Sequence, residues 1–280
     1  MYSTRILKDS LAPCGKRLTT WELTYPRFVH AELMTHRLFS RNSASSRAIP
    51  VEKLLARVRE DPALPLWWGK NQAGMQAQEE MQGDQRDEAQ RLWLAARDQM
   101  MAVVAQLGEL GLHKQLANRL IEPWMFITVI VSATEFDNWF HLRNHRAAQP
   151  EIAWVAKDMW ARFNEGKPAA LAPTEWHLPL FDEITDFHLV NYDTAKAKKV
   201  STGRCARVSY LTHEGVRDVE KDIELHDRLC AGPATGDPGH WSPFEHVARA
   251  LDKPDRVGNF IGWFQYRKEF EQEHFGGRMP

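Results

Sequence analysis

Long hydrophobic runs and closely spaced cysteines are both missing from this sequence. The most continuous apolar run, WMFITVIV at residues 124–131, has eight residues, whereas a membrane-spanning helix needs about 20. The first ten residues contain no apolar core that would indicate a secretory signal. Cys14, Cys205 and Cys230 lie far apart and form no C-x-x-C pair, which is typical of a reduced protein. We therefore expect a soluble cytoplasmic protein with no membrane partner.

The sequence also lacks an excess of charge of either sign. Its formal net charge is -1, so it has no global basic field of the kind that nucleic-acid-binding proteins carry, and a nucleic-acid partner is not expected. No G-x-G-x-x-G follows a predicted strand, and no G-x-x-x-x-G-K-[ST] is present, so neither a Rossmann site nor a P-loop is indicated. What is present is a 43% hydrophobic chain of 280 residues with 11 Trp and 13 Phe, enough for a substantial core.

Hydrophobic periodicity predicts many helices and a few strands, which is the α+β class. Rough alternation in RLTTWELTYP, with a half-buried face that includes Leu18, Trp21 and Leu23, predicts a strand that ends at Pro26. Segments with helical spacing or helix-end signals are residues 28–39, 87–111, 114–123, 133–149, 150–166 and 218–231. Polar or Gly/Pro-rich segments, predicted as loops or connectors, are residues 42–46, 61–74, 167–199 and 232–246. Residues 51–86 as a whole are polar and irregular.

One short stretch, MTHRLFSRNSASSRAIP at residues 34–50, is crowded with basic and hydroxyl side chains. Its basic residues are His36, Arg37, Arg41 and Arg47, and its hydroxyls are Thr35, Ser40, Ser43, Ser45 and Ser46. Arginine makes fork-shaped, charge-assisted hydrogen bonds to phosphates, and serine adds neutral donors. The stretch therefore suggests a site for an anionic ligand, with a solvated basic loop as the alternative.

Other chemistry-bearing residues are less informative. His141 and His145 have a spacing that can bind metal on a helix, but no Cys or carboxylate lies at a matching offset, and we predict no metal site. Nothing beside Cys14 would activate its thiolate. Trp67 and Trp68 either cover a ligand or pack on the core, and we favour packing.

Five separate stretches together resemble the flavin-dependent thymidylate synthases. They are THRLFSRNSASSR (35–47), NRLIEP (118–123), SATEFDNWFHLRNHRAAQPEI (132–152), ARVSY (206–210) and GHWSPFEH (239–246). The family signature is Arg-His-Arg, seven residues, then Ser, and His36-Arg37 and Ser45 keep this spacing. NRLIEP resembles Ala-Arg-x-x-Leu-Pro, which places Arg119 on the arginine. The long third stretch places Arg143 on a second arginine.

The order of these stretches is rotated relative to the family, which indicates a circular permutation. Residues 1–165 resemble the C-terminal part of the family and residues 200–270 the N-terminal part, while residues 51–90 match nothing in it and are predicted to be an insertion. A permutation requires the original ends to lie close together at the surface. The resemblance implies one catalytic domain over 1–280, with helices packed on a mostly antiparallel sheet.

The resemblance also implies roles for named residues. The flavin side, for FAD, comprises His36, Arg37, Asn42, Asn138 and Ser242. The substrate side, for a nucleotide such as dUMP, comprises Glu32, Ser45, Ser46, Arg47, Arg119 and Arg143. Arg143 is the predicted catalytic residue, because a guanidinium keeps its proton near neutral pH and can stabilise a pyrimidine ring anion. The structural alternative for Arg143 and for Arg119 is a salt bridge on a helix surface.

The same resemblance implies the reaction and its partners. A one-carbon unit passes from methylenetetrahydrofolate to C5 of dUMP, with reduced FAD as the hydride source and NADPH as the reductant of FAD. The family also implies a homo-oligomer, a tetramer whose active sites use several subunits.

Several positions depart from the family pattern. Thr35 replaces the first arginine of the signature and Ser43 a glutamate, while Ser132 and Thr134 replace an Asn and an Arg on the flavin side. The lost positive charge should weaken the grip on FAD phosphates unless Arg41 or Arg146 compensates.

Glu32 stands where the family has a glutamine near the nucleotide, and an ionised carboxylate accepts hydrogen bonds but donates none. It would favour the amino group of cytosine, so methylation or hydroxymethylation of dCMP is a second hypothesis. A non-catalytic relative that binds nucleotides or nucleic acid is a third.

Overall fold

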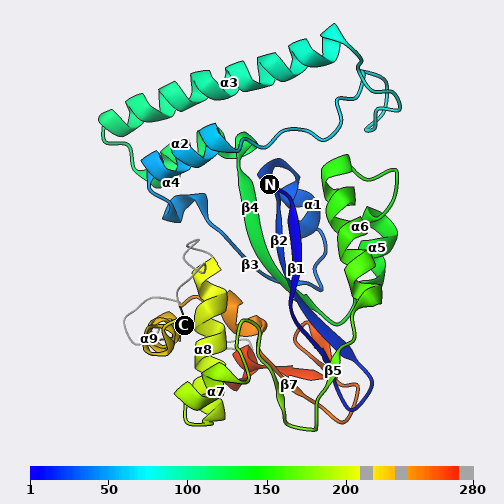
Figure 1. Ribbon diagram of the computed structural model, residues 1–280, viewed down its shortest axis with the longest axis vertical. Helices are drawn as coiled ribbons and strands as arrows, with labels where there is room; N and C mark the ends of the chain where they lie inside the picture. Colours follow the sequence, from blue (N-terminus) through cyan, green and yellow to red (C-terminus); the bar gives the residue numbers. More distant parts are fainter. Residues whose placement is uncertain (209–216, 231–238, 271–280) are drawn as a thin grey trace, which may run out of the picture.

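A five-stranded sheet in the order β3-β4-β2-β1-β5 lies at the centre of the protein (Figure 1). The structure is a computed structural model that describes residues 1–208, 217–230 and 239–270. The strands are β1 (Ser3–Leu11), β2 (Arg17–Pro26), β3 (Ser40–Ser43), β4 (Phe126–Ala133) and β5 (Ala169–Ala170). All neighbouring pairs are antiparallel except β1 and β5. The predicted α+β class with a mostly antiparallel sheet is confirmed.

Strand β2 shows how the sequence pattern builds this sheet. Side chains alternate between the two faces of a strand, and Trp21, Leu23 and Tyr25 lie on one face, where they are fully buried. The other face of β2 is also covered, because Leu18 and Thr20 are fully buried as well. The predicted strand and its end at proline are confirmed, but the expected half-buried strand is covered on both sides.

Helices cover the face that carries Trp21. They are α1 (His30–Met34), α5 (Asp137–Arg143) and α6 (Pro150–Glu165). Helix α6 begins with proline at its first position, where the missing N–H costs nothing, and buries Ile152, Val155 and Met159 against the sheet. The helix predicted over 28–39 is much shorter than expected, and Met34 lies outside the core with 44% of its surface exposed.

A second group of helices lies at one end of the molecule (Figure 1). It consists of η2 (Ser46–Ala48), α2 (Val51–Glu60), α3 (Asp84–Glu109), α4 (Lys114–Ala117) and the 3-10 helix η3 (Asn118–Trp124). Residues 51–86 are polar and irregular in sequence, yet α2 lies within them, because Leu54 and Val58 recur at helical spacing and bury against the group's own core. The loop predicted over 61–74 is confirmed, since it contains no helix and only an isolated bridge at Gly69. In this loop, Trp68 packs edge-on against Trp93 at 6.2 Å.

The C-terminal part covers the opposite face of the sheet. Its elements are β6 (Trp176–His177), α7 (Thr185–Leu189), α8 (Thr194–Arg207), α9 (Val219–Cys230), η5 (Ser242–Glu245), β7 (Ala248–Ala250), β8 (Arg256–Val257), β9 (Phe260–Ile261), β10 (Trp263–Gln265) and η6 (Tyr266–Glu269). Strands β10, β7 and β6 form a second antiparallel sheet.

Three boundary predictions are wrong. The predicted connector over 167–199 contains α7 and the start of α8, and the predicted loop over 42–46 begins within strand β3, which pairs with β4. The helix predicted over 133–149 begins only at Asp137 and ends at Arg143. Of the loop predicted over 232–246, residues 232–238 lie outside the described residues.

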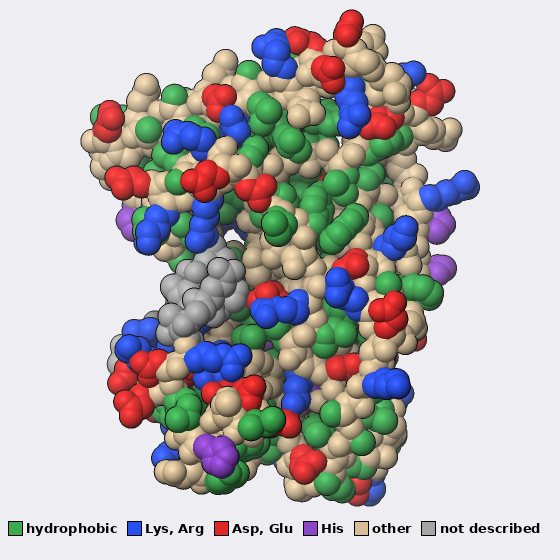
Figure 2. Space-filling view, in the orientation of Figure 1, with side chains coloured by type: hydrophobic (Ala, Val, Ile, Leu, Met, Phe, Trp, Pro, Cys, Tyr) green, Lys and Arg blue, Asp and Glu red, His purple; other side chains and the backbone are tan. Residues whose placement is uncertain are grey.

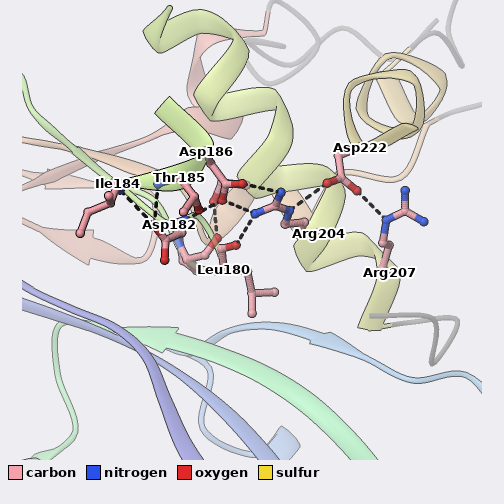
Figure 3. Close-up of polar contacts among 10 residues, drawn as sticks. Leu180, Asp182, Ile184, Thr185, Asp186, Arg204, Arg207 and Asp222 are labelled. Carbon is pink, nitrogen blue, oxygen red and sulfur yellow. Dashed lines mark hydrogen bonds and ion pairs between the residues drawn. The ribbon is translucent and has the colours of Figure 1, made fainter. Parts of the chain in front are cut away.

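A buried ionic network joins α7, α8 and α9 (Figure 3). Arg204 donates to both carboxylate oxygens of Asp186 and, through Nε, to Asp222 at 2.8 Å. Arg207 donates to the other oxygen of Asp222 at 2.6 Å. Helix α9 approaches closely at Gly203, where an added Cβ would lie 2.2 Å from the carbonyl oxygen of Asp222. We call these two arginines and two aspartates the closed cluster.

Acidic and basic side chains are mixed over the face of the molecule in Figure 2. This agrees with a formal net charge near zero. Among the described residues, none of the helices combines the length and the apolar character needed to cross a membrane.

Candidate functional site

Arg143 ends helix α5 and reaches across to α1. Its Nη1 donates to Glu32 Oε2 at 3.0 Å, its Nη2 donates to Thr35 Oγ1 at 3.2 Å, and its Nε donates to His36 Nε2 at 3.2 Å. The Arg143 side chain is 20% exposed and that of Glu32 is 26% exposed. The structure therefore brings three of the predicted residues into one cluster, which with Thr35 we call the half-open cluster.

His36 is the buried member of this cluster. It stacks on Phe39 and meets Trp139 edge-on. Burial, together with the positive charges of Arg143 and Arg41, lowers the pKa of His36 to about 4. The ring is therefore neutral near pH 7. Because a guanidinium can only donate, Nε2 of His36 accepts from Arg143, and the single ring proton belongs on Nδ1.

The pKa of Glu32, the acidic partner of Arg143, is raised above its ordinary value. Burial raises the pKa of Glu32, Arg143 lowers it by a smaller amount, and the carboxylate of Glu151 raises it further. Glu151 is 1% exposed, and its Oε1 accepts from the backbone N–H of Leu66 at 2.7 Å. We did not assign Glu151 to the site from the sequence, although it belongs to the quoted AQPEI stretch. It binds the segment after α2 and acts on Glu32 through its charge.

A second contact joins residues from opposite ends of the chain. Asn42, on β3, donates through Nδ2 to the backbone carbonyl of Cys205 at 2.7 Å, and its Oδ1 accepts from Ser242 Oγ at 3.3 Å. Ser242 also hydrogen-bonds His240 at 3.0 Å. Asn42 and Ser242, both predicted on the flavin side, are thus neighbours despite a separation of 200 positions.

A third group forms around Glu122 on η3. Its Oε1 accepts from Ser46 Oγ at 2.6 Å and from Arg119 Nη1 at 2.9 Å. Its Oε2 lies 3.0 Å from Arg27 Nε. Glu122 therefore holds two predicted substrate residues, Ser46 and Arg119, in one place, and the Arg119 side chain remains 47% exposed. This glutamate lies within NRLIEP, but the sequence pattern gives no indication of its role.

The other predicted residues stand at the surface. Arg37, Arg47 and Asn138 are exposed and Ser45 is half-buried. Within the described part of the chain, no hydrogen bond or ion pair is made by the side chains of these four residues.

Arg41 and Arg146, the two arginines that could compensate for Thr35, differ in their exposure and in their partners. Arg41 is turned inward, where its Nη1 donates to the carbonyls of Met34 and His36. Arg146 is exposed. Of the two, Arg146 is the one available to an anionic ligand.

The His141 and His145 pair is exposed. A different group, His226, Asp227 and Cys230, places one possible metal-ligand atom from each residue within 4.8 Å of the others. Lys199 pairs with Asp227 at 2.7 Å, and His226 bonds Tyr266 at 3.1 Å. Because these groups are already partnered, we assign no metal to them.

A cavity of about 500 Å³ lies between α2 and the strands of the central sheet. Glu22, Thr24, Leu54, Arg57 and Trp124 are among its lining residues. None of the predicted site residues lines it.

Comparison with known proteins identifies a family whose model matches this chain. The model described as thymidylate synthase complementing protein matches residues 17–169, a range that contains every predicted site residue except Ser242. No curated protein matches the chain.

Two solved structures are similar, both described as the UMP/dUMP methylase PolB from Streptomyces cacaoi. The one bound with 5-Br UMP has 15% identity and a TM-score of 0.48, covering 59% of this chain and 89% of its own. The one bound with 5-Br dUMP has 18% identity and a TM-score of 0.45, covering 53% of this chain and 67% of its own. Similarity this low supports no argument about function. Because the family match spans more than half of the sequence, this chain belongs to the thymidylate synthase complementing protein family.

Proposed function

We propose that this chain is a flavin-dependent pyrimidine nucleotide C5 methyltransferase that converts dUMP to dTMP. The observation that carries the proposal is the half-open cluster, in which Arg143 stays partly exposed while Glu32, Thr35 and His36 hold its guanidinium in place. Family membership supports the reaction class. The cluster supplies the guanidinium of Arg143, which is suited to stabilising an anionic pyrimidine ring.

The nucleotide phosphate would bind at the exposed basic residues Arg47 and Arg119. Ser45 is half-buried two positions before Arg47. Ser46 is buried and donates its hydroxyl to Glu122, which also pairs with Arg119, so Ser46 would hold Glu122 in place rather than contact the phosphate. Arginine provides paired donors for phosphate oxygens, and serine provides neutral donors. Binding of the phosphate here would leave Arg143 for the base.

Arg143 would stabilise the pyrimidine ring when N3 loses its proton. A guanidinium is a poor general base because it does not deprotonate near neutral pH. It is instead a fixed positive charge, and such charges lower the energy of a developing anion when they are held in position beforehand. The ionised ring has an electron-rich C5, which can accept the one-carbon unit.

The described residues fit FAD as the cofactor. Arg37 and Arg146 are exposed cations, and Asn138 is exposed on α5. His36, Asn42 and Ser242 are hydrogen-bonded within the protein and would shape the flavin side of the site. When bound, reduced FAD would supply the hydride that converts the transferred methylene to methyl, with methylenetetrahydrofolate as the carbon donor and NADPH as the reductant. The residues of this chain would bind and orient these groups.

The circular permutation is part of the proposal. The contacts of Asn42 with Cys205 and Ser242 support it, because they bring the C-terminal stretches beside the signature stretch. We propose one catalytic domain that assembles as a homotetramer, in which the open basic surface would be completed by neighbouring subunits.

A second candidate substrate is dCMP, and Glu32 is the observation that favours it. One carboxylate oxygen pairs with Arg143, and the other would accept a hydrogen bond from the amino group of cytosine. Uracil has a carbonyl at that position, which a carboxylate cannot donate to.

The visible absorption spectrum of the purified protein tests the proposal. A flavin spectrum that is bleached by NADPH is the expected result. A protein that takes up no FAD when FAD is added in excess would contradict the enzyme proposal and favour a non-catalytic relative. Turnover of dUMP compared with dCMP then separates the two substrates.

A further inference from the structure

The cavity between α2 and the central sheet receives three polar side chains from the sheet. Glu22 and Thr24 lie two positions apart on β2, so they point to the same face, and Thr128 is paired opposite Thr24 on β4. All three line the cavity. Its volume of about 500 Å³ is in the range of small-molecule sites, which combine a few converging polar groups with a larger apolar lining.

The wall opposite these polar groups is apolar. Its side chains come from α2, η3 and the residues beside them, and all are buried: Ile49, Leu54, Val58, Trp124 and Met125. The indole N–H of Trp124 donates to the carbonyl of Trp93 at 3.1 Å, so the one polar atom of this ring is already satisfied. A flat ring that enters the cavity would therefore pack against an apolar surface.

The polar groups offer acceptors and one donor. Arg5 holds the Glu22 carboxylate through a bond of 2.8 Å, and a carboxylate has about four acceptor positions, so Glu22 can bind a ligand together with Arg5. The hydroxyls of Thr24 and Thr128 bond each other at 3.0 Å. That bond uses one of their two protons, and within the described residues the other proton makes no bond. A ligand therefore meets two carboxylate oxygens and then one hydroxyl donor.

We propose that this cavity binds a 2-amino-4-oxopyrimidine ring, which guanine and the pterins share. The edge of this ring has two adjacent N–H donors and then a carbonyl acceptor, which matches the two oxygens of Glu22 and the hydroxyl donor of the threonine pair. Uracil has an acceptor, a donor and an acceptor on its edge, and cytosine has a donor and two acceptors, so neither matches. The cavity is thus separate from the proposed nucleotide site, and the inference does not depend on the proposed function.

The exposed residues of the cavity indicate where the rest of the ligand lies. Arg57 lines the cavity and is exposed, and its side chain makes no hydrogen bond or ion pair in the part of the chain that the structure describes. Of the two acids beside it, Asp61 pairs with the amino group of Met1 at 2.5 Å and Glu60 is exposed. Arg57 can therefore bind an anionic group outside the ring, which is a phosphate in a guanine nucleotide and a glutamate tail in a pterin cofactor.

Calorimetric titration of the full chain without FAD tests the ring and needs no variant. GMP and tetrahydrofolate are the two probes, because they carry the same ring edge on different bodies, and we expect at least one of them to bind. Its analogue without the 2-amino group, IMP or 2-desaminotetrahydrofolate, should bind about tenfold more weakly, since one N–H donor is lost. No binding of either probe, or equal affinity for a probe and its analogue, would overturn the proposal.

The Glu22→Gln variant tests the carboxylate. An amide has one acceptor oxygen, and its NH₂ group opposes an N–H of the ring, so we expect the affinity to fall about 10–100-fold. Glu52→Gln is the matched control, because Glu52 is exposed in the first turn of α2 and does not line the cavity. Its affinity should stay within about twofold of the wild type. Equal affinities for the two variants would place the binding elsewhere and overturn the proposal.

The source of the ring and the proposed function are tested separately. Tighter binding of tetrahydrofolate would assign the cavity to the carbon donor of the proposed reaction, and tighter binding of GMP would assign it to a guanine nucleotide that acts as an effector. Both results support the ring chemistry. A chain that takes up no FAD but binds either probe through Glu22 would contradict the proposed function and leave this site in place.

Discussion

The closed cluster and the half-open cluster are built from the same kinds of side chain and differ in how completely their charges are paired. Arg204 is 5% exposed at its side chain and bonds two carboxylates at 2.5–3.0 Å. Arg143 is 20% exposed, faces one carboxylate, and completes its bonds with a carbonyl, a hydroxyl and a neutral imidazole at 3.0–3.3 Å.

This difference separates a structural role from a binding role. Two arginines and two aspartates in the closed cluster balance each other (Figure 3), and removing one member would leave a buried charge uncompensated. In the half-open cluster, Glu32 is the one acid that bonds Arg143 within the described residues. The positive charge of Arg143 therefore faces one carboxylate where that of Arg204 faces two, as expected of a group that binds an anionic ligand.

The largest expected effect is loss of stability when the closed cluster is broken. Asp222→Asn removes the charge that Arg204 and Arg207 share, at a site that is 0% exposed. We expect the free energy of unfolding to fall by about 3–5 kcal/mol, measured by urea denaturation. The exposed Asp252 provides the control, and Asp252→Asn should change stability by less than about 0.5 kcal/mol. Equal stabilities for the two variants would show that the closed cluster is not structural.

The next effect is loss of turnover when the half-open cluster is broken. Arg143→Ala should lower kcat/KM for dUMP by about 10²–10³, because it removes one preorganised electrostatic group. The urea midpoint should change little, since this arginine is partly exposed. Steady-state kinetics of the FAD-loaded protein measures this effect. Full turnover in this variant would remove Arg143 from the catalytic role.

The two clusters should also respond differently to acid. The pKa of His36 is about 4 in the folded protein and near 6.5 when unfolded, so the unfolded chain binds more protons between these values. The free energy of unfolding should therefore fall as pH drops from 6.5 to 4. His36→Gln should make this decline shallower in urea denaturation at pH 7 and pH 5, and an unchanged slope would argue against a neutral His36.

The closed cluster should keep its charge over the same pH range. Burial raises the pKa of Asp186, but the hydrogen bonds from Arg204 and from the backbone N–H of Asp182, together with the charges of Arg204 and Arg217, hold that pKa below its usual value. For a lowered carboxyl pKa, the stabilising effect is lost only as pH falls from the unfolded value near 3.9 toward the folded one. Asp186 should therefore stay ionised at pH 5, which carbon-13 NMR of the labelled carboxylate would show.

The smallest expected effect is on nucleotide affinity. Arg119 is 47% exposed and pairs with Glu122 at the surface, and exposed pairs contribute little to stability. Arg119→Ala should raise KM for dUMP about tenfold with kcat nearly unchanged, because it removes a phosphate contact that is equal in ground state and transition state. A loss in kcat instead would place Arg119 nearer to the base than to the phosphate.

Much of the fold could be predicted from local patterns. Alternation in β2, the proline at the start of α6 and the glycine after α3 mark these elements directly in the sequence. Strand β3 could not be predicted in this way, because Ser40–Ser43 is a polar segment that is extended only through pairing with β4. Tertiary pairing decides its conformation, not intrinsic preference.

The residues of the candidate site could be predicted only in part from the sequence. Resemblance to a family singled out His36 and Arg143, which lie in contact. It did not single out Glu122 or Glu151, whose roles depend on which distant groups the fold brings to them.

The most direct test of the account is the identity of the product. The FAD-loaded protein is supplied with dUMP, methylenetetrahydrofolate and NADPH, and the nucleotide is analysed by mass spectrometry. The account predicts dTMP, formed by the wild type and lost in Arg143→Ala. Unchanged dUMP after incubation with the flavin-loaded wild type would contradict it.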